Sequence, residues 1–384
     1  MNKYICVDER AMILLESYDF WEMREGSERM GTKPRYIYFD ILSIVASLAV
    51  IFLHCNGIVH WGPATPHWSQ ALAVEVGFYW AVPIFFMCSG AKTLAYRARK
   101  DTKAFLLSRM KGIFAPFLAW SVIQYLVRMS GLLNSAPENW TFSLGNFVTA
   151  FMNSQIDGTY WFFFAMFGVT LSIPVLSRLK DNKDTLWYLV GAYVLLSGTI
   201  APLCKVLGLP WNGSIAITVA GGYVMYTVLG YLLSQDTELF AARGRRLALY
   251  GLGVLGLAVR YGYTWISSQQ VGALDNALFD YNYLTAILPS VAVFVFFKQV
   301  DWDGVLARLH ISAKLVKQIA GLTFGVYLMH YFVLNEVFVL RLGMDMTSYA
   351  VRLGLPWVIF GLCLACSFVL NRIPFLRGIV GGWR

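Results

Sequence analysis

From residue 36 onward the chain alternates between long apolar segments and short polar connections. A helix that crosses the hydrocarbon core of a bilayer needs ~20 mostly apolar residues, and the segments have about that length. The pattern therefore predicts an all-α polytopic membrane protein, a bundle of about ten transmembrane helices. The predicted segments cover approximately residues 36–55, 71–91, 112–130, 158–176, 186–204, 215–234, 247–266, 282–298, 319–341 and 351–370.

The composition agrees with a membrane protein. Of the 384 residues, 58% are hydrophobic and 14% are charged, whereas a soluble domain carries about 25% charged residues. The net charge of +9 is explained by loop charge that sets orientation and attracts anionic membrane lipids, so no nucleic-acid partner is expected. The six cysteines show no spacing typical of metal ligands, and no metal is expected.

Lysine and arginine are concentrated in alternate loops. They follow the second, fourth, sixth and eighth segments, whereas the other loops hold almost only Lys205. By the positive-inside rule, the basic loops and both termini are cytoplasmic, as in a multi-pass plasma-membrane protein. The chain then divides into a polar cytoplasmic tail at 1–34, a ten-helix membrane domain at 35–372 and a short cytoplasmic tail at 373–384.

The first segment, RYIYFDILSIVASLAVIFLHCN at Arg35–Asn56, combines an apolar run with a polar stripe. At ~100° per residue one helix face collects its polar side chains, which are Asp40, Ser43, Ser47 and His54. An ionisable group inside a membrane usually marks a site, and an imidazole suits general-base catalysis. The alternative is a packing stripe that ends in an interfacial histidine. Asp40 and His54 are ~21 Å apart along the axis, so a partner of His54 must come from another helix.

A second intramembrane histidine, His330, lies in GLTFGVYLMHYF of the ninth segment. Thr323, Tyr327 and Tyr331 are predicted on the same face by their i, i+3 and i+4 spacing. Glu336, six residues further on, is expected to point elsewhere. His330 is therefore a second candidate for the chemistry.

The second segment ends in VPIFFMCSGA at 82–91, where Gly90 permits close approach of another backbone. The loop beyond it carries clustered cations, which suit phosphate groups. The alternative is ordinary positive-inside charge that attracts anionic lipid. The candidate phosphate-binding residues are Arg97, Arg99, Lys100, Arg109 and Lys111.

Aromatic and isolated charged residues add further candidates. Tyr160 and Trp161 open the fourth segment, where an aromatic belt or a sugar-stacking platform explains them. An isolated charge in or beside an apolar segment needs a partner, and the sequence does not pair the charges of this kind, which are Glu75, Arg128 and Arg260.

These stretches together resemble the membrane acyltransferase family three, the O-acyltransferases that modify bacterial polysaccharides, lipopolysaccharide, peptidoglycan and small molecules. The resemblance covers nearly the whole chain after residue 35, with its motifs in the family's order. They are YFDILSIVASLAVIFLH at 38–54, VPIFFMCSGA at 82–91, SRMKGIFAPFLAW at 108–120, GTYWFFFAMFGVTLSIPVL at 158–176 and FGVYLMHYFVL at 324–334.

The resemblance implies roles for individual residues. His54 matches the family's catalytic histidine, and the loop 97–111 matches the segment that engages the acyl donor. His330 matches the histidine of a YL-x-H motif and is expected to support His54 or the oxyanion. The family has a basic residue eleven positions before the catalytic histidine, where this chain has Ser43; either another cation reaches the site, donor handling differs, or this member is altered. The candidate acceptor-binding residues are Asp40, Ser43, Glu75, Tyr160, Trp161 and Tyr327.

We therefore expect a bacterial membrane O-acyltransferase that uses cytoplasmic acyl-CoA, with acetyl-CoA as the expected donor. The expected acceptor is a hydroxyl of an extracytoplasmic or lipid-linked glycan or small molecule, and His54 is the expected base. The donor's pantetheine arm would extend through the bundle, because the phosphates and His54 are predicted near opposite faces. The rival hypothesis, which Ser43 favours, is a membrane transporter or sensor for a small polar molecule without acyl transfer.

Overall fold

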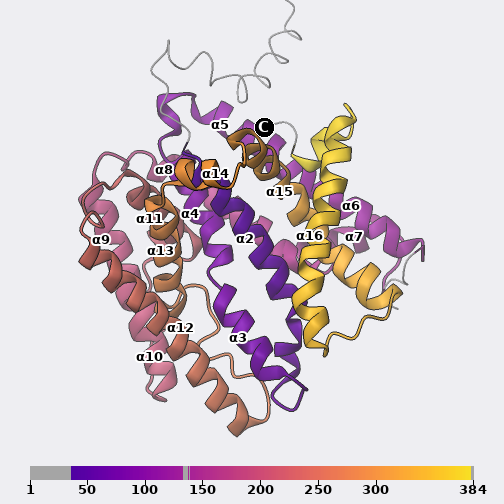
Figure 1. Cartoon of the computed structure of the whole chain (residues 1–384), viewed down its shortest axis with the longest axis horizontal. Coiled ribbons are helices and arrows are strands. Elements are labelled where there is room, and N and C mark those ends of the chain that lie inside the picture. Colours follow the sequence, from indigo (N-terminus) through magenta and orange to yellow (C-terminus); the bar gives the residue numbers. More distant parts are fainter. Residues whose placement is uncertain (1–35, 133–136, 138, 382–384) are drawn as a thin grey trace, which may run out of the picture.

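A computed structural model describes residues 36–132, 137 and 139–381 of the chain. Every regular element in these ranges is a helix, so the predicted all-α class is confirmed. Figure 1 shows the helices packed beside one another in one bundle. The predicted tail at 1–34 lies outside the described residues.

The helices follow the predicted apolar segments, and several segments are divided. The α-helices are α2 (Tyr38–Cys55), α3 (Trp68–Phe78), α4 (Ala81–Thr93), α5 (Thr102–Arg109), α6 (Ala115–Met129), α7 (Leu144–Met152), α8 (Trp161–Leu176), α9 (Lys183–Tyr193), α10 (Ala201–Val206), α11 (Tyr223–Gln235), α12 (Arg243–Val271), α13 (Leu284–Gln299), α14 (Trp302–Arg308), α15 (Ala313–Phe332) and α16 (Tyr349–Arg372). π-Helical turns continue α5, α9 and α15, and they are η4 (Met110–Phe114), η6 (Val194–Ile200) and η8 (Val333–Arg341).

Seven continuous helical stretches in the described ranges are long and apolar enough to cross a membrane. An eighth candidate joins α13 and α14, which are bent by 68° at their junction. The predicted seventh segment lies in α12, which is not among these stretches. This helix begins with Arg243, Arg245 and Arg246 and buries Arg260 in its middle. The predicted sixth segment contains α11, whose 13 residues are fewer than a straight span needs. A multi-pass membrane bundle is thus confirmed, and the number ten stays a prediction.

The four basic loops gather at one end of the bundle, which we call the basic end. Arg97, after α4, donates to Ser177 Oγ at the end of α8 (2.8 Å). In the following loop, the Lys180 carbonyl accepts from the Tyr231 hydroxyl of α11 (3.2 Å). Lys298, at the end of α13, donates to a backbone carbonyl near the end of α11 (2.6 Å). The side of the membrane that this end faces stays a prediction.

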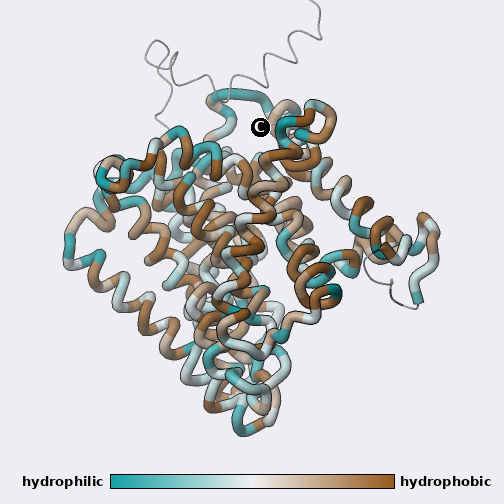
Figure 2. The backbone as a smooth tube through the Cα atoms, turned by 45° about the vertical axis from the view of Figure 1, so that its right-hand side comes forward, coloured by the Kyte–Doolittle hydropathy of each residue, from teal (hydrophilic) through white to brown (hydrophobic). Residues whose placement is uncertain are grey.

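Both ends of the described chain also lie at the basic end. The Lys92 ammonium lies 5.2 Å from the ring centre of Phe39, in the first turn of α2. At the other terminus, Trp120 of α6 donates to the carbonyl of Ile379 (2.8 Å) in η9 (Arg377–Val380). The described part of the predicted C-terminal tail therefore packs against the bundle. In Figure 2 hydrophobic colour dominates the helices, and hydrophilic colour marks the connections at the upper end.

The closest helix contact joins α4 and α11. A Cβ added to Gly90 would lie 1.8 Å from the backbone oxygen of Thr227, and a Cβ added to Gly230 would lie 2.1 Å from that of Met87. Only glycine permits backbones to approach so closely. The predicted close approach at Gly90 is confirmed, and it fixes α4, which leads into the basic loop.

Candidate functional site

The two intramembrane histidines meet in the interior of the bundle. Their ring centres are 5.3 Å apart, and the ring of Tyr331 lies 5.3 Å from that of His54. His330 is only 1% exposed, and His54 is largely covered. Sequence reasoning required a partner for His54 from another helix, and the structure brings His330 to that place.

The register of α2 and α15 explains why the rings of His54 and His330 lie close together. Both helices begin at the basic end and run in the same direction, and Figure 1 shows them next to each other. Each carries its histidine in its last turn. The two imidazoles consequently lie at a similar depth, several turns away from the basic end.

The hydrogen bonding of His330 defines which nitrogen carries the proton. Its Nδ1 lies 2.7 Å from the carbonyl oxygen of Tyr327. A carbonyl only accepts, so Nδ1 is the protonated nitrogen and Nε2 holds the lone pair of the neutral ring. Among the described residues Nε2 has no hydrogen-bond partner. Nε2 of His330 is therefore a buried hydrogen-bond acceptor without a protein partner in the described chain, on a ring that neighbours His54.

A hydrogen-bonded network supports this part of α15. The hydroxyl of Tyr160 donates to the Leu328 carbonyl (2.9 Å) and accepts from the Gln124 amide (2.7 Å). The Tyr327 hydroxyl donates to the carbonyl of Thr159 (3.4 Å). Of the predicted acceptor residues, Tyr327 lies next to His330, with ring centres 5.3 Å apart, and Tyr160 contacts α15 at Leu328. Both hydroxyls hold neighbouring helices together.

The other polar residues of α2 do not join the histidines. Ser43 donates to the Phe39 carbonyl of its own helix (2.7 Å). Asp40 is buried in the first turn of α2, near Cys88 and the basic end. Both lie more than two helical turns from His54. The predicted polar stripe is therefore divided between the two ends of α2.

The predicted phosphate-binding cations occupy one surface at the basic end, but Arg97 differs from the rest. It donates to Ser177 Oγ and to the carbonyl of Pro174 (3.0 Å), and so completes the end of α8. Arg99 donates to the Lys92 carbonyl (2.9 Å) and is exposed at the surface. The structure thus separates one structural arginine from the surface cations.

The surface cations stand close to one another. Lys100 donates to Ser108 Oγ (2.8 Å), and the Arg109 guanidinium lies 5.6 Å from the ring centre of Phe105. Partial burial, together with the positive charges of Arg109 and Arg99, holds the pKa of Lys100 below its ordinary value. Concentrated positive charge of this kind attracts polyanions. Lys111, two residues beyond Arg109, is exposed.

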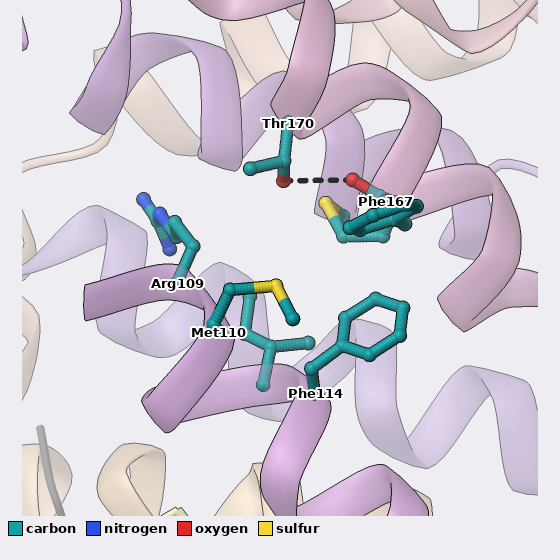
Figure 3. A pocket seen from close by; sticks show the side chains of 7 residues that line it. Arg109, Met110, Phe114, Phe167 and Thr170 are labelled. Atoms are coloured by element: carbon teal, nitrogen blue, oxygen red, sulfur yellow. Dashed lines mark hydrogen bonds between the residues drawn. The ribbon is translucent and has the colours of Figure 1, made fainter. Parts of the chain in front are cut away.

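A small apolar pocket opens beside Arg109, between η4 and α8 (Figure 3). Its volume is about 10 Å³, roughly the space of one water molecule. Met110, Phe114 and Phe167 form its apolar walls, and Thr170 turns its hydroxyl to the Met166 carbonyl (2.8 Å). The pocket is a notch behind the basic surface and does not reach the histidines.

Comparison with known proteins places the chain. A family profile described as an acyltransferase domain, acyltransferase 3, matches residues 36–372. The chain belongs to the acyltransferase 3 family. The match includes both histidines and the basic loop, and it confirms the resemblance that the motifs indicated. No curated protein and no solved structure matches the chain.

The bundle also contains buried polar residues that sequence reasoning left unpaired or missed. Arg128 of α6 forms an ion pair with the buried Glu336 of η8 (2.8 Å), so both charges that the sequence left unpaired are explained by each other. Gln124, one turn before Arg128, was not singled out, because a glutamine in an apolar segment gives no distinctive signal. The i, i+4 spacing of the two on α6 was the available clue.

The remaining predicted residues lie in another part of the interior. Glu75 of α3 and Trp161 of α8 belong to an aromatic group around the buried Arg260 of α12. Tyr79 covers the guanidinium of Arg260, which lies 3.6 Å from the ring centre.

Proposed function

We propose that this acyltransferase moves an acetyl group from cytoplasmic acetyl-CoA to a hydroxyl of an extracytoplasmic or lipid-linked glycan or small molecule. The observation that carries the proposal is the histidine pair. Two imidazoles from different helices lie 5.3 Å apart inside an apolar bundle, and one of them keeps an open acceptor nitrogen. Buried ionisable groups are costly inside a membrane and are usually retained for function.

In this proposal His54 is the general base. It takes the proton of the acceptor hydroxyl as the hydroxyl oxygen attacks the thioester carbon, and the carbon–sulfur bond then breaks. The sulfur leaves as the thiol of CoA, with the proton returned from His54. His330 supports this step by accepting a hydrogen bond at Nε2 from the hydroxyl or from His54. Because its Nδ1–H is used by Tyr327, a role as donor to the oxyanion is disfavoured.

The donor phosphates would bind the surface cations of the basic loop, namely Arg99, Lys100, Arg109 and Lys111. Guanidinium and ammonium groups pair well with phosphate oxygens, and the positive charges of Arg99 and Arg109 act on Lys100 at this surface. The notch behind Arg109 is the place where the pantetheine arm would enter. Since it holds only about 10 Å³, α8 and η4 must separate for entry, and π-helical turns such as η4 are frequent at functional sites.

The test is consumption of radiolabelled acetyl-CoA by the purified protein in nanodiscs, with a mixed hydroxyl acceptor pool. His54→Ala is expected to lower turnover about 100- to 10,000-fold, the usual contribution of a general base, while donor binding is kept. His60→Ala removes an exposed histidine near the end of the same helix and is the matched control. Equal turnover of wild type and His54→Ala would refute the proposal. Uptake of acceptor molecules into vesicles without donor consumption would favour the transporter hypothesis.

A further inference from the structure

Asp157 is a buried carboxylate in the turn that precedes α8, at the end of that helix opposite to the basic end. Its Oδ1 accepts from the backbone N–H of Thr159 (2.9 Å) and from the Thr159 hydroxyl (2.7 Å). These bonds hold η5 (Gly158–Tyr160), a single 3-10 turn. The first N–H groups of a helical turn have no partner inside it, so the Asp157 carboxylate determines how this turn is held.

The turn η5 contacts α15 at two consecutive residues. The hydroxyl of Tyr160 donates to the Leu328 carbonyl (2.9 Å), and the carbonyl of Thr159 accepts from the Tyr327 hydroxyl (3.4 Å). All four residues are buried. The position of Tyr327 and Leu328 relative to α8 therefore depends on the conformation of η5.

Tyr327 in turn fixes the imidazole of His330, one helical turn further along α15. The carbonyl oxygen of Tyr327 lies 2.7 Å from Nδ1 of His330, and the centres of the two rings are 5.3 Å apart. The hydrogen bond that one ring nitrogen makes decides which nitrogen of a neutral histidine carries the proton. A shift of Tyr327 would consequently release both the orientation and the tautomer of His330.

We infer that Asp157 is a positioning residue for His330. Through Thr159 and η5 it holds the part of α15 that keeps the proton on Nδ1 and leaves Nε2 as an acceptor on the ring that neighbours His54. The alternative is an ordinary N-cap, which would stabilise the turn and leave His330 unchanged. The effect on His330 does not depend on the proposed function, whereas the effect of Asp157 on acetyl transfer rests on it.

Magic-angle-spinning NMR of the full chain in lipid bilayers tests this inference without any acyl donor. The imidazole nitrogens of the five histidines are isotope-labelled, and the spectrum of His330→Asn identifies the signals of His330 by difference. Wild type is expected to show one neutral His330 tautomer with the proton on Nδ1. Asp157→Ala is expected to add signals of a second tautomer or orientation. Asp157→Asn keeps an oxygen that accepts from Thr159 and is expected to retain the wild-type signals.

The matched control is Asp301→Ala. Asp301 caps α14 in the same way, by accepting from the backbone N–H of Gly304 (3.1 Å), so its loss should lower the melting temperature and leave the His330 signals unchanged. If Asp157→Ala does not fold, Thr159→Val takes its place, because it removes only one of the two bonds to Asp157. Unchanged His330 signals in the folded variant, or a wild-type His330 with its proton on Nε2, would overturn the inference.

Acetyl-CoA consumption by the same samples separates this inference from the proposed function. Asp157→Ala is expected to lower turnover about 10- to 100-fold with donor affinity unchanged, because a catalytic group that is misplaced by a small distance loses rate of this order. Asp157→Asn should restore most of the turnover. Altered His330 signals together with a wild type that consumes no acetyl-CoA would refute the proposed function alone. Consumption by wild type together with unchanged His330 signals in Asp157→Ala would refute the role of Asp157 alone.

Discussion

The basic end and the histidine pair are built in opposite ways. The surface cations come from one stretch of sequence and are held by local bonds, such as Lys100 to Ser108 and Arg99 to the Lys92 carbonyl. The histidine pair is assembled from α2 and α15 and supported by Gln124 of α6 and by Tyr160, in the turn that precedes α8. An exposed charge contributes to binding and little to stability, whereas a buried polar group affects both. Substitutions at the two places should consequently differ in kind.

The largest effect is expected at the ion pair beside the histidines. Arg128→Met removes the ion pair of the buried Glu336, and breaking a buried pair costs about 3–5 kcal/mol of stability. The double variant Arg128→Met/Glu336→Leu should recover most of that loss, because no buried charge remains. Thermal and denaturant unfolding in detergent measure both. If Arg128→Met were as stable as wild type, the ion pair between Arg128 and Glu336 would not be formed in the folded protein.

The next effect concerns the open nitrogen of His330. In His330→Asn the side-chain amide can still donate to the Tyr327 carbonyl, but the acceptor at Nε2 is lost. Turnover is expected to fall about 10- to 100-fold, as for loss of one good hydrogen bond in a transition state, with donor affinity unchanged. Tyr331→Phe is the control, because it keeps a ring beside His54. A change in donor affinity instead of turnover would contradict the assigned role.

At the basic end a smaller effect on affinity is expected. Arg99→Ala/Lys100→Ala should weaken acetyl-CoA binding about tenfold at low salt and less at moderate salt, because exposed charges are screened. The unfolding transition should remain within about 0.5 kcal/mol of wild type. Titration calorimetry at two ionic strengths measures the affinity. Binding that is insensitive to both salt and substitution would remove the donor from this surface.

The smallest expected effect distinguishes Arg97 from Arg99 and Lys100 within the basic loop. Arg97→Ala removes the bonds to Ser177 and Pro174 at the end of α8, so about 1 kcal/mol of stability should be lost. Donor affinity at moderate salt should change less than in the Arg99→Ala/Lys100→Ala variant. The reverse ranking would place Arg97 among the phosphate ligands, as the sequence alone suggested.

The sequence identified what depends on local pattern. Apolar length predicted the membrane helices, alternate loop charge predicted the basic end, and Gly90 predicted the close contact of α4 with α11. Both histidines were found because an ionisable group is rare inside an apolar segment. Arg128 and Arg260 were noticed for the same reason.

What the sequence could not provide is the partnership between distant residues. Whether His54 contacts His330 depends on the register and rotation of α2 against α15. That register and rotation depend in turn on the packing of all the helices. Asp40 and Ser43 share a face with His54, but helix length separates them from it. Glu336 pairs with Arg128 from η8, a π-helical stretch that begins after His330, whereas periodicity assumes a regular α-helix.

The central claim is that the donor's phosphates bind the basic end while its acyl carbon reacts at the histidine pair. Photocrosslinking with an acyl-CoA that carries a diazirine on its acyl chain tests this directly, with crosslinked peptides located by mass spectrometry. The account predicts crosslinks in α2 near His54 and in α15 near His330, lost in competition with acetyl-CoA. Crosslinks confined to the loop 97–111 and the notch beside Arg109 would contradict it.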